Sequence, residues 1–261
     1  MALSESIKQE ILNIIINCLR NKFISYKPET NSMPFHYRLL GRDRIALLSF
    51  MHSLNRSFIT SIFEPVAETL AKAKFPYSKK QYDIGNIISE ESQRVVQTIL
   101  DELSTRIRTP DKKKEIEEIR KVCKNGKMHK VKPTKVDLLL KDNSGKVYLF
   151  DLKTAKPNIS EFKSYKRTLL EWIAIYLYKE EGAKINSYIA IPYNPYEPQP
   201  YQRWTLKGLF DLDNEILVGK EFWDFLGGTG AYEDLLNCFE QAGIILRGEI
   251  DAYFSKFQND K

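Results

Sequence analysis

The sequence is poor in the residue types on which several common classes of protein depend. It has only three cysteines, Cys18, Cys123 and Cys238, which are odd in number and far apart. This excludes a disulfide framework, and the lack of a CxxC pair argues against a zinc site. The longest apolar run, residues 11–19, is interrupted by polar residues and is too short to span a bilayer. The first ten residues lack the features of a signal peptide, so we expect a cytoplasmic protein without a membrane segment.

The positive charge of the chain is concentrated in one short window. The 261 residues are 43% hydrophobic and 28% charged, which is enough to bury a full core, and the net charge is +6. Residues 106–135 hold twelve Lys or Arg against four acids, a net +8, so the remainder of the chain sums to −2. Such a window is typical of a protein that binds a polyanion. The alternative interpretation is a solvated charged loop.

Hydrophobic periodicity predicts helices first, then strands, then helices again. The first hundred residues follow helical spacing, with Ser4 or Ser6 and then Ser89 as N-caps and an interruption near Pro65. The later elements are a hairpin of residues 135–140 and 147–152 around turn residues 142–145, a helix over 160–179, a strand over 186–191, and helices over 221–226 and 232–257 separated by a glycine-rich turn. This order predicts an α/β fold with a mixed sheet flanked by helices and a largely helical N-terminal part.

We expect one domain across residues 1–261 that consists of three consecutive parts. The boundaries predicted from the pattern are a helical N-terminal part over 1–80, a central core over 81–204 that holds the predicted strands, and a helical C-terminal part over 205–261.

Two acidic residues interrupt the apolar strands of the predicted hairpin. Asp137 lies between Val136 and three leucines, and Asp151 follows Phe150. A carboxylate in such a run costs several kcal/mol unless cations or hydrogen bonds compensate it. Because residues two apart in a strand share a face, Asp151 and Lys153 point together, and the hairpin brings Asp137 beside them. The alternative is that both acids make turn hydrogen bonds and that Lys153 is solvated.

Two carboxylates without histidine or cysteine favour a hard cation. Mg²⁺ accepts one or two carboxylates, keeps several waters and binds a substrate phosphate. Such an ion lowers the pKa of water and stabilises charge on a scissile phosphate. A neighbouring lysine positions that water or neutralises the transition state. The pattern therefore predicts Mg²⁺ held by Asp137 and Asp151, with Lys153 as the catalytic amine.

These residues resemble a known family. Val136-Asp137, a turn and then Phe150-Asp151-Leu152-Lys153-Thr154 is similar to the signature of the PD-(D/E)xK nuclease superfamily, an acid on one strand and acid-x-Lys on the next. Val136 stands where the name-giving proline would be. The wider stretch of residues 135–172 resembles type II restriction endonucleases, in particular the TdeIII-type group, and the similarity extends over about residues 82–204.

The resemblance implies a restriction-endonuclease-like fold and assigns roles to particular residues. Asp137 and Asp151 would be metal ligands, the main-chain carbonyl of Leu152 would complete the coordination, and Lys153 would be the catalytic lysine. The family often adds a glutamate from a preceding helix. Here Glu90 and Glu91 are the candidates, and helical geometry favours Glu91 because it lies nearer the apolar stripe. The alternative is that both acids simply interact with the helix dipole.

Two further segments are candidates for DNA contact. The basic window precedes the catalytic strands, and Lys156, Lys163, Lys166 and Arg167 follow them. Lysine and arginine contacts to phosphate supply affinity and orientation. The loop from Tyr193 to Trp204 is rich in proline and tyrosine and holds Gln199, Gln202 and Arg203, residue types that read base edges. The alternative is a packed loop whose tyrosines cover the sheet edge.

The leading hypothesis is a type II restriction enzyme that hydrolyses double-stranded DNA at a specific sequence with Mg²⁺. A homodimer is expected, because twofold symmetry matches a palindromic site. The resemblance further implies a short, interrupted GC-rich site and a partner methyltransferase that protects host DNA. Two alternatives stay open: a structure-specific repair or recombination nuclease, and an inactive DNA-binding module of the same fold. Cleavage of plain duplex into discrete fragments, or binding without cleavage, discriminates among them.

Overall fold

The structure is a computed structural model that describes residues 3–132, 135–155, 159–201 and 206–257. The chain divides into two compact units, one made of residues 1–69 and 229–261 and the other of residues 70–228. None of the helices in the described ranges is long and apolar enough to cross a membrane. The unit boundaries differ from the three consecutive parts expected from the sequence, because the two ends of the chain belong to the same unit.

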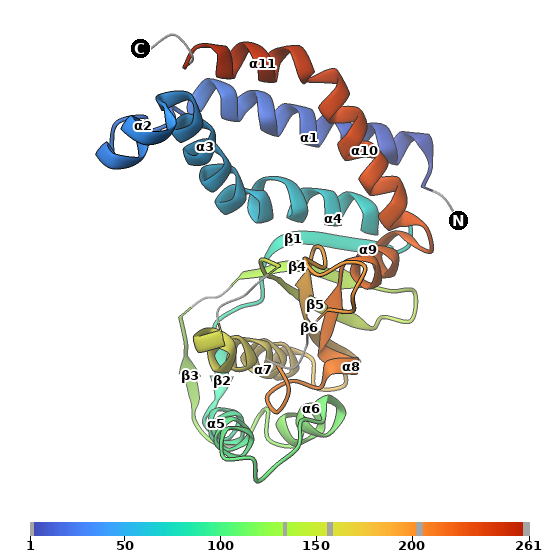
Figure 1. Ribbon diagram of the computed structural model, residues 1–261. Coiled ribbons are helices and arrows are strands. Elements are labelled where there is room, and N and C mark those ends of the chain that lie inside the picture. The colour runs from blue at the N-terminus through green and yellow to red at the C-terminus, as the bar shows by residue number, and fades with distance from the viewer. Residues whose placement is uncertain (1–2, 133–134, 156–158, 202–205, 258–261) are drawn as a thin grey trace. The chain divides into compact units, whose positions relative to one another are not determined.

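The first unit is built from helices at both ends of the chain (Figure 1). They are α1 (Glu5–Ser25), α2 (Pro34–Leu40), α3 (Arg42–Phe58), the π-helical turn η1 (Ile59–Phe63), α4 (Glu64–Ala71), α10 (Ala231–Ile245) and α11 (Arg247–Ser255). The last residues of α4 lie past the unit boundary. Ser4 caps α1, since its hydroxyl accepts the main-chain N–H of Ile7. The helix α1 packs along α10, and α11 packs against α3. Aromatic rings fill this contact: the Phe50 ring lies 5.3 Å from those of both Tyr253 and Phe254.

The second unit has a mixed five-stranded sheet at its centre. Its strands are β1 (Tyr77–Asp83), β4 (Lys135–Lys141), β5 (Val147–Leu152), β6 (Ile185–Ile191) and β7 (Ile216–Val218), in the order β1-β4-β5-β6-β7. The pairs β1–β4 and β4–β5 are antiparallel, and β5–β6 and β6–β7 are parallel. A separate two-stranded sheet joins β2 (Ile87–Ser89) and β3 (Met128–Lys130).

The hairpin between β4 and β5 is closed by a turn that its sequence specifies. One carboxylate oxygen of Asp142 accepts the main-chain N–H groups of Ser144 and Lys146, and the other accepts the hydroxyl of Tyr148. Gly145 adopts φ 78°, a left-handed conformation that glycine enters without steric cost. The turn therefore fixes the register of the two strands that carry the acidic residues.

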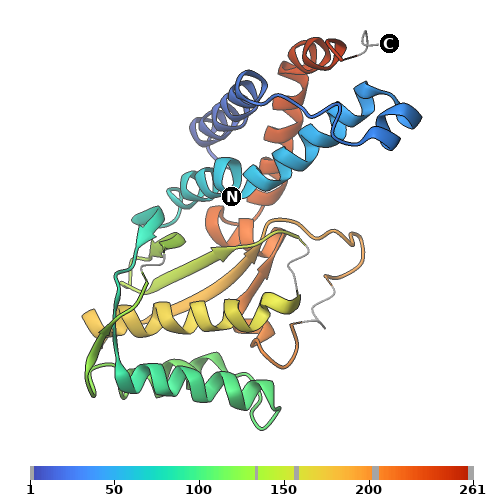
Figure 2. The same cartoon turned by 90° about the vertical axis from the view of Figure 1, so that its left-hand side faces the viewer.

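Helices cover both faces of this sheet. They are α5 (Glu90–Ser104), α6 (Lys112–Arg120), the 3-10 turn η2 (Ile159–Glu161), α7 (Phe162–Lys179), α8 (Leu212–Glu215) and α9 (Lys220–Gly227). The helix α7 connects the parallel strands β5 and β6, which cannot be joined by a tight turn. Figure 2 shows α7, in yellow, running along one face of the sheet. The helix α5, in green, lies beside α7 on the side away from the sheet.

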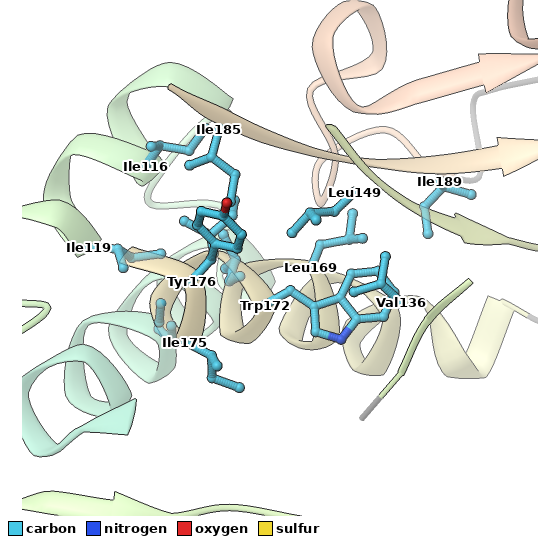
Figure 3. Packing of buried hydrophobic residues seen from close by; sticks show 14 of the residues in the cluster. Ile116, Ile119, Val136, Leu149, Leu169, Trp172, Ile175, Tyr176, Ile185 and Ile189 are labelled. Atoms are coloured by element: carbon cyan, nitrogen blue, oxygen red, sulfur yellow. The ribbon is translucent and has the colours of Figure 1, made fainter. Parts of the chain in front are cut away.

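The largest core lies between the sheet and α7. Trp172 and Leu169 of α7 pack with Val136 of β4 and Leu149 of β5 (Figure 3). All four are at most 2% exposed, and burial of a side chain of this size contributes about 1.5–3 kcal/mol. The opposite face of the sheet is aromatic: the Phe150 ring lies 5.2 Å from Tyr188 and 5.6 Å from Phe222 of α9. The acidic motif is thus attached to strands that are buried on both faces.

The expected α/β class, the mixed sheet and the helical N-terminal part are confirmed. The hairpin, the helix α7 and the strand β6 lie where the pattern predicted them, and Ser89 caps α5. The prediction that the first hundred residues are helical was wrong for residues 77–89, which form β1 and β2. The polar edge strand β1 and the three-residue β2 carry no apolar stripe. The predicted helix over 232–257 is two helices, α10 and α11, which meet at Leu246.

Candidate active site

The hairpin places the two acidic residues of the motif opposite each other. At the end of the hairpin away from the turn, Leu138 and Phe150 are the last paired residues of β4 and β5. Asp137 and Asp151 are therefore next in the register. The strand pairing stops there, and the main-chain N–H of Leu152 donates instead to Oδ2 of Asp137 at 2.8 Å. The two strands therefore part at the position where the carboxylates face each other.

The lysine of the motif joins them on the face of the sheet that α7 covers. Leu149 packs under α7, and Asp151 and Lys153 follow it at steps of two, which keeps all three on that face. The Nζ of Lys153 lies 2.6 Å from Oδ1 of Asp151. The main-chain N–H of Lys153 donates to the carbonyl of Ala190 at 2.9 Å, which extends the pairing of β5 with β6. The structure thus brings together Asp137, Asp151 and Lys153.

Burial controls the electrostatics of the two carboxylates. Asp151 is only 5% exposed, and burial, with a contribution from the neighbouring Asp137, raises its pKa to about 7 although Lys153 opposes the shift. Burial also raises the pKa of Asp137, and the N–H of Leu152 acts in the opposite direction. Two ionised carboxylates at this place repel each other in a poorly solvated site, so a bound cation would stabilise both.

Two side chains that sequence reasoning missed contact the motif. Lys153 lies 4.3 Å from the centre of the Tyr165 ring, at cation–π distance. Tyr165 in turn donates its hydroxyl to Glu161, four residues earlier, and burial raises the tyrosine pKa. Gln81 of β1 donates from Nε2 to Oδ1 of Asp137 at 3.3 Å. No local pattern marks either residue, since Tyr165 reaches the motif from α7 and Gln81 reaches it from β1.

The structure places Glu91 at the start of α5, where its carboxylate pairs with Arg94 at 2.9 Å. Glu90 pairs with the same arginine, also at 2.9 Å. Across the described ranges, no group of three or more His, Cys, Asp and Glu side chains could hold a metal ion. Glu91 is therefore not gathered with Asp137 and Asp151, and its role in the site stays a prediction, as does that of the Leu152 carbonyl.

The basic window is only partly a surface feature. Lys112 is buried, and Nζ lies 2.7 Å from Oε1 of Glu215, so this residue does not face a polyanion. Arg108 pairs with Glu118, and Arg120 pairs with Glu117. The exposed lysines of the window are Lys113, Lys114, Lys121, Lys124, Lys127, Lys130, Lys132 and Lys135. These eight lysines therefore lie at the surface, as the polyanion-binding interpretation requires.

The expectation that Lys166 faces DNA was wrong. This residue is fully buried, and its ammonium lies 2.7 Å from Glu115 and 2.6 Å from Glu215. The Lys166 side chain points from α7 toward α6 and α8, where its charge balances the two buried carboxylates. Lys163 is exposed but pairs with Asp101 at 3.2 Å.

Arg167 donates to the amide oxygen of Gln97 and pairs with Glu171 at 3.6 Å, so its contacts are with α5 and with its own helix. Lys156 lies outside the described residues.

The Tyr/Pro-rich loop is anchored beside the motif. The Tyr201 hydroxyl donates to the main-chain carbonyl of Ala155 at 3.0 Å, and its ring lies 5.9 Å from that of Tyr196. Tyr201 also packs against the core, which matches the packed-loop interpretation for this residue. Gln199 is exposed, whereas Gln202, Arg203 and Trp204 lie outside the described residues.

Comparison with known proteins identifies a family and several similar restriction enzymes. A protein family described as "Type II restriction endonuclease, HinfI" matches residues 3–243. Among similar curated proteins, the type II restriction enzyme HgiEI of Herpetosiphon aurantiacus is 24% identical over 222 residues, which covers 83% of this chain and 79% of the relative. The type II restriction enzyme MjaII of Methanocaldococcus jannaschii is 26% identical over 256 residues, covering 87% of this chain and 68% of the relative.

Proposed function

Because the chain belongs to the HinfI family of type II restriction endonucleases, we propose that it is a Mg²⁺-dependent enzyme that cuts double-stranded DNA at a specific sequence through Asp137, Asp151 and Lys153. One observation carries the choice of residues. The two carboxylates face each other where β4 and β5 part, and the lysine ammonium lies 2.6 Å from one of them.

The donor set suits a magnesium ion. Asp137 and Asp151 supply carboxylate oxygens, and the main-chain carbonyl of Leu152 lies between Asp151 and Lys153 in the sequence. Mg²⁺ binds through one or two carboxylates and keeps sites for waters and for a phosphate, so two acids are sufficient. When bound, the ion supplies positive charge that acidifies water and stabilises negative charge on the scissile phosphate.

Each of the protein's own site residues has a separate proposed role. Asp137 and Asp151 would hold the cation, and the hydrogen bond from the Leu152 N–H fixes one oxygen of Asp137. Lys153, held over the Tyr165 ring, donates hydrogen bonds to the phosphate that bears the developing charge. Glu91 is retained as a candidate fourth residue, which would have to move from Arg94 to act.

Duplex DNA is held by the exposed lysines of the basic window. Lys127, Lys130 and Lys132 lie on or beside β3 and are exposed. Such side chains contact phosphates and supply orientation without sequence information. We further propose a homodimer, because two symmetric active sites cut both strands of a palindromic site, and a methyltransferase partner that protects host DNA.

Plasmid cleavage tests this function directly. Purified protein incubated with plasmid DNA and Mg²⁺ is expected to produce discrete fragments, and protein in EDTA none. The Asp151→Ala and Lys153→Ala variants should lose at least about 100-fold in cleavage rate, since each removes a group that stabilises the transition state. Both should still retard duplex DNA in a gel.

The same experiment separates the alternatives. Cutting that is confined to branched or single-stranded DNA would favour a structure-specific nuclease, and binding without cutting an inactive DNA-binding module. Full activity in either variant would remove that residue from the mechanism. Sedimentation of the protein with and without a duplex tests the homodimer.

A further inference from the structure

Gln81 forms a row with the two acidic residues across three neighbouring strands. The β1–β4 register pairs Tyr82 with Val136, which places Gln81 opposite Asp137. Asp137 in turn lies opposite Asp151. Neither Gln81 nor Asp137 is itself a paired residue of the ladder, so the contact depends on the side chains. The amide of Gln81 reaches the row, because its Nε2 lies 3.3 Å from Oδ1 of Asp137.

The Asp137 carboxylate is held from two sides. The main-chain N–H of Leu152 donates to Oδ2 at 2.8 Å, and Nε2 of Gln81 donates to Oδ1 at 3.3 Å. One donor alone leaves the carboxylate free to turn about its Cβ–Cγ bond, whereas two donors on different oxygens fix its plane. A fixed plane matters here, since Asp137 and Asp151 would have to present their oxygens to the same cation.

The backbone at Gln81 is strained in a way that the strand does not require. Its φ is +49°, and the only other described residue besides glycine with a positive φ is Arg106. An L-residue in this region costs about 1–3 kcal/mol and persists mainly where surrounding structure or function demands it. The strand continues in the same register on both sides, from Lys80 opposite Leu138 to Tyr82, so the conformation does not make a turn. The conformation occurs at the position opposite Asp137, where the side chain of Gln81 contacts that carboxylate.

On these observations, and resting on the function proposed above, we propose that Gln81 is a positioning residue that fixes the Asp137 carboxylate for divalent metal binding. Groups that orient metal ligands in this way typically change metal affinity by about 10- to 100-fold when removed. A glutamine that only occupied an edge strand would have no effect on metal affinity.

Two substitutions distinguish the effect of the Gln81 side chain from the effect of its backbone conformation. Gln81→Asn keeps a residue that tolerates positive φ but shortens the side chain by one methylene, so its amide no longer reaches Asp137. Gln81→Gly removes the side chain and relieves the strain. Arg106→Gly is the matched control, because it relieves the other positive φ, +61°, on a residue outside the row.

The measurement is calorimetric titration of the metal-free full-length protein with Mn²⁺ in the absence of DNA, together with thermal unfolding. Gln81→Asn and Gln81→Gly are expected to bind Mn²⁺ about 10-fold more weakly than wild type, with the Arg106→Gly control unchanged. Gln81→Gly should unfold at the wild-type temperature or above. In cleavage assays the two Gln81 variants should need more Mg²⁺ for half-maximal rate and recover most of the rate at saturating Mg²⁺.

The possible outcomes distinguish this inference from the proposed function. Wild-type Mn²⁺ affinity in both Gln81 variants overturns the role of Gln81 and leaves the metal-dependent nuclease standing. Weak binding that accompanies a large loss of thermal stability in both variants also overturns it, because a structural role then explains the effect. Failure of the wild-type protein to bind Mn²⁺ overturns the proposed function and this inference together.

Discussion

At the scale of single residues, the proposed site holds a buried carboxylate at a cost to the stability of the fold. Asp151 is nearly fully buried, and its raised pKa, about 7, means that the folded protein disfavours the ionised form. Asp142, in the turn of the same hairpin, is the opposite case: hydrogen bonds from Ser144 and Tyr148 lower its pKa to about 2. The ionised form of Asp142 therefore stabilises the fold above about pH 4, and this stabilisation is lost as the pH falls through about 2.

This contrast predicts opposite effects of the same chemical change. Asp151→Asn should raise the unfolding temperature of the metal-free protein at pH 8, by about 2–4 °C for each kcal/mol gained, while abolishing cleavage. Asp142→Asn, the control, should lower the unfolding temperature and leave the active site intact. Thermal unfolding in EDTA measures both. A decrease with Asp151→Asn would mean that its ionised carboxylate stabilises the fold.

At the scale of elements, a buried charge network ties α6, α7 and α8 together. Lys166 contacts Glu115 and Glu215, and Lys112 contacts Glu215. Burial opposes ionisation of Glu215, but the two lysines outweigh it and lower its pKa. Glu115, with one lysine as its hydrogen-bonded partner, has a pKa raised by burial, and its Oε1 is buried without a hydrogen-bond partner. The network holds α7, the helix that follows β5 in the chain.

Breaking this network should be costly. Lys166→Met keeps the length of the side chain but removes the ammonium that both glutamates share, so we expect a loss of about 3–5 kcal/mol in the free energy of unfolding. Lys163→Met on the same helix is the control, with an expected change within about 0.5 kcal/mol because this lysine is exposed. Urea unfolding measures both variants. Equal losses would show that the buried ion pairs contribute no more than a surface pair.

At the scale of the whole molecule, the cationic residues of the basic window fall into two groups, those paired with acids and those that stay exposed. The net charge is +6, and residues 106–135 hold more than all of it. Some of these cations are neutralised inside the protein, as with Lys112, or by neighbouring acids, as with Arg108. The lysines that stay exposed form the part of the window available to DNA phosphates.

The salt dependence of DNA binding should report how many phosphates these lysines neutralise. Replacing Lys127, Lys130 and Lys132 by alanine is expected to reduce the slope of log K against log salt by about 0.9 for each phosphate that the protein no longer neutralises. Replacing the exposed Lys184, outside the window, should leave the slope unchanged. Titration of a non-specific duplex at several salt concentrations measures the slopes. An unchanged slope in the triple variant would place the DNA elsewhere.

The hairpin and its acidic motif could be predicted from local sequence alone. Alternating apolar residues, the Asp142–Gly145 turn and two carboxylates inside buried strands are local patterns, and local patterns can be read without knowledge of the fold. They were sufficient to predict that Asp137 and Asp151 meet and that Lys153 joins them.

The distant residues that surround the motif, in contrast, depend on how the whole chain packs. Gln81 lies 56 positions before Asp137 and reaches it through an edge strand without an apolar stripe. Lys166 looked like a surface cation, because nothing near it in the sequence shows that Glu115 and Glu215 meet it in the interior. Pairing between strands and burial of charge are set by the packing of remote segments, which no short window of sequence contains.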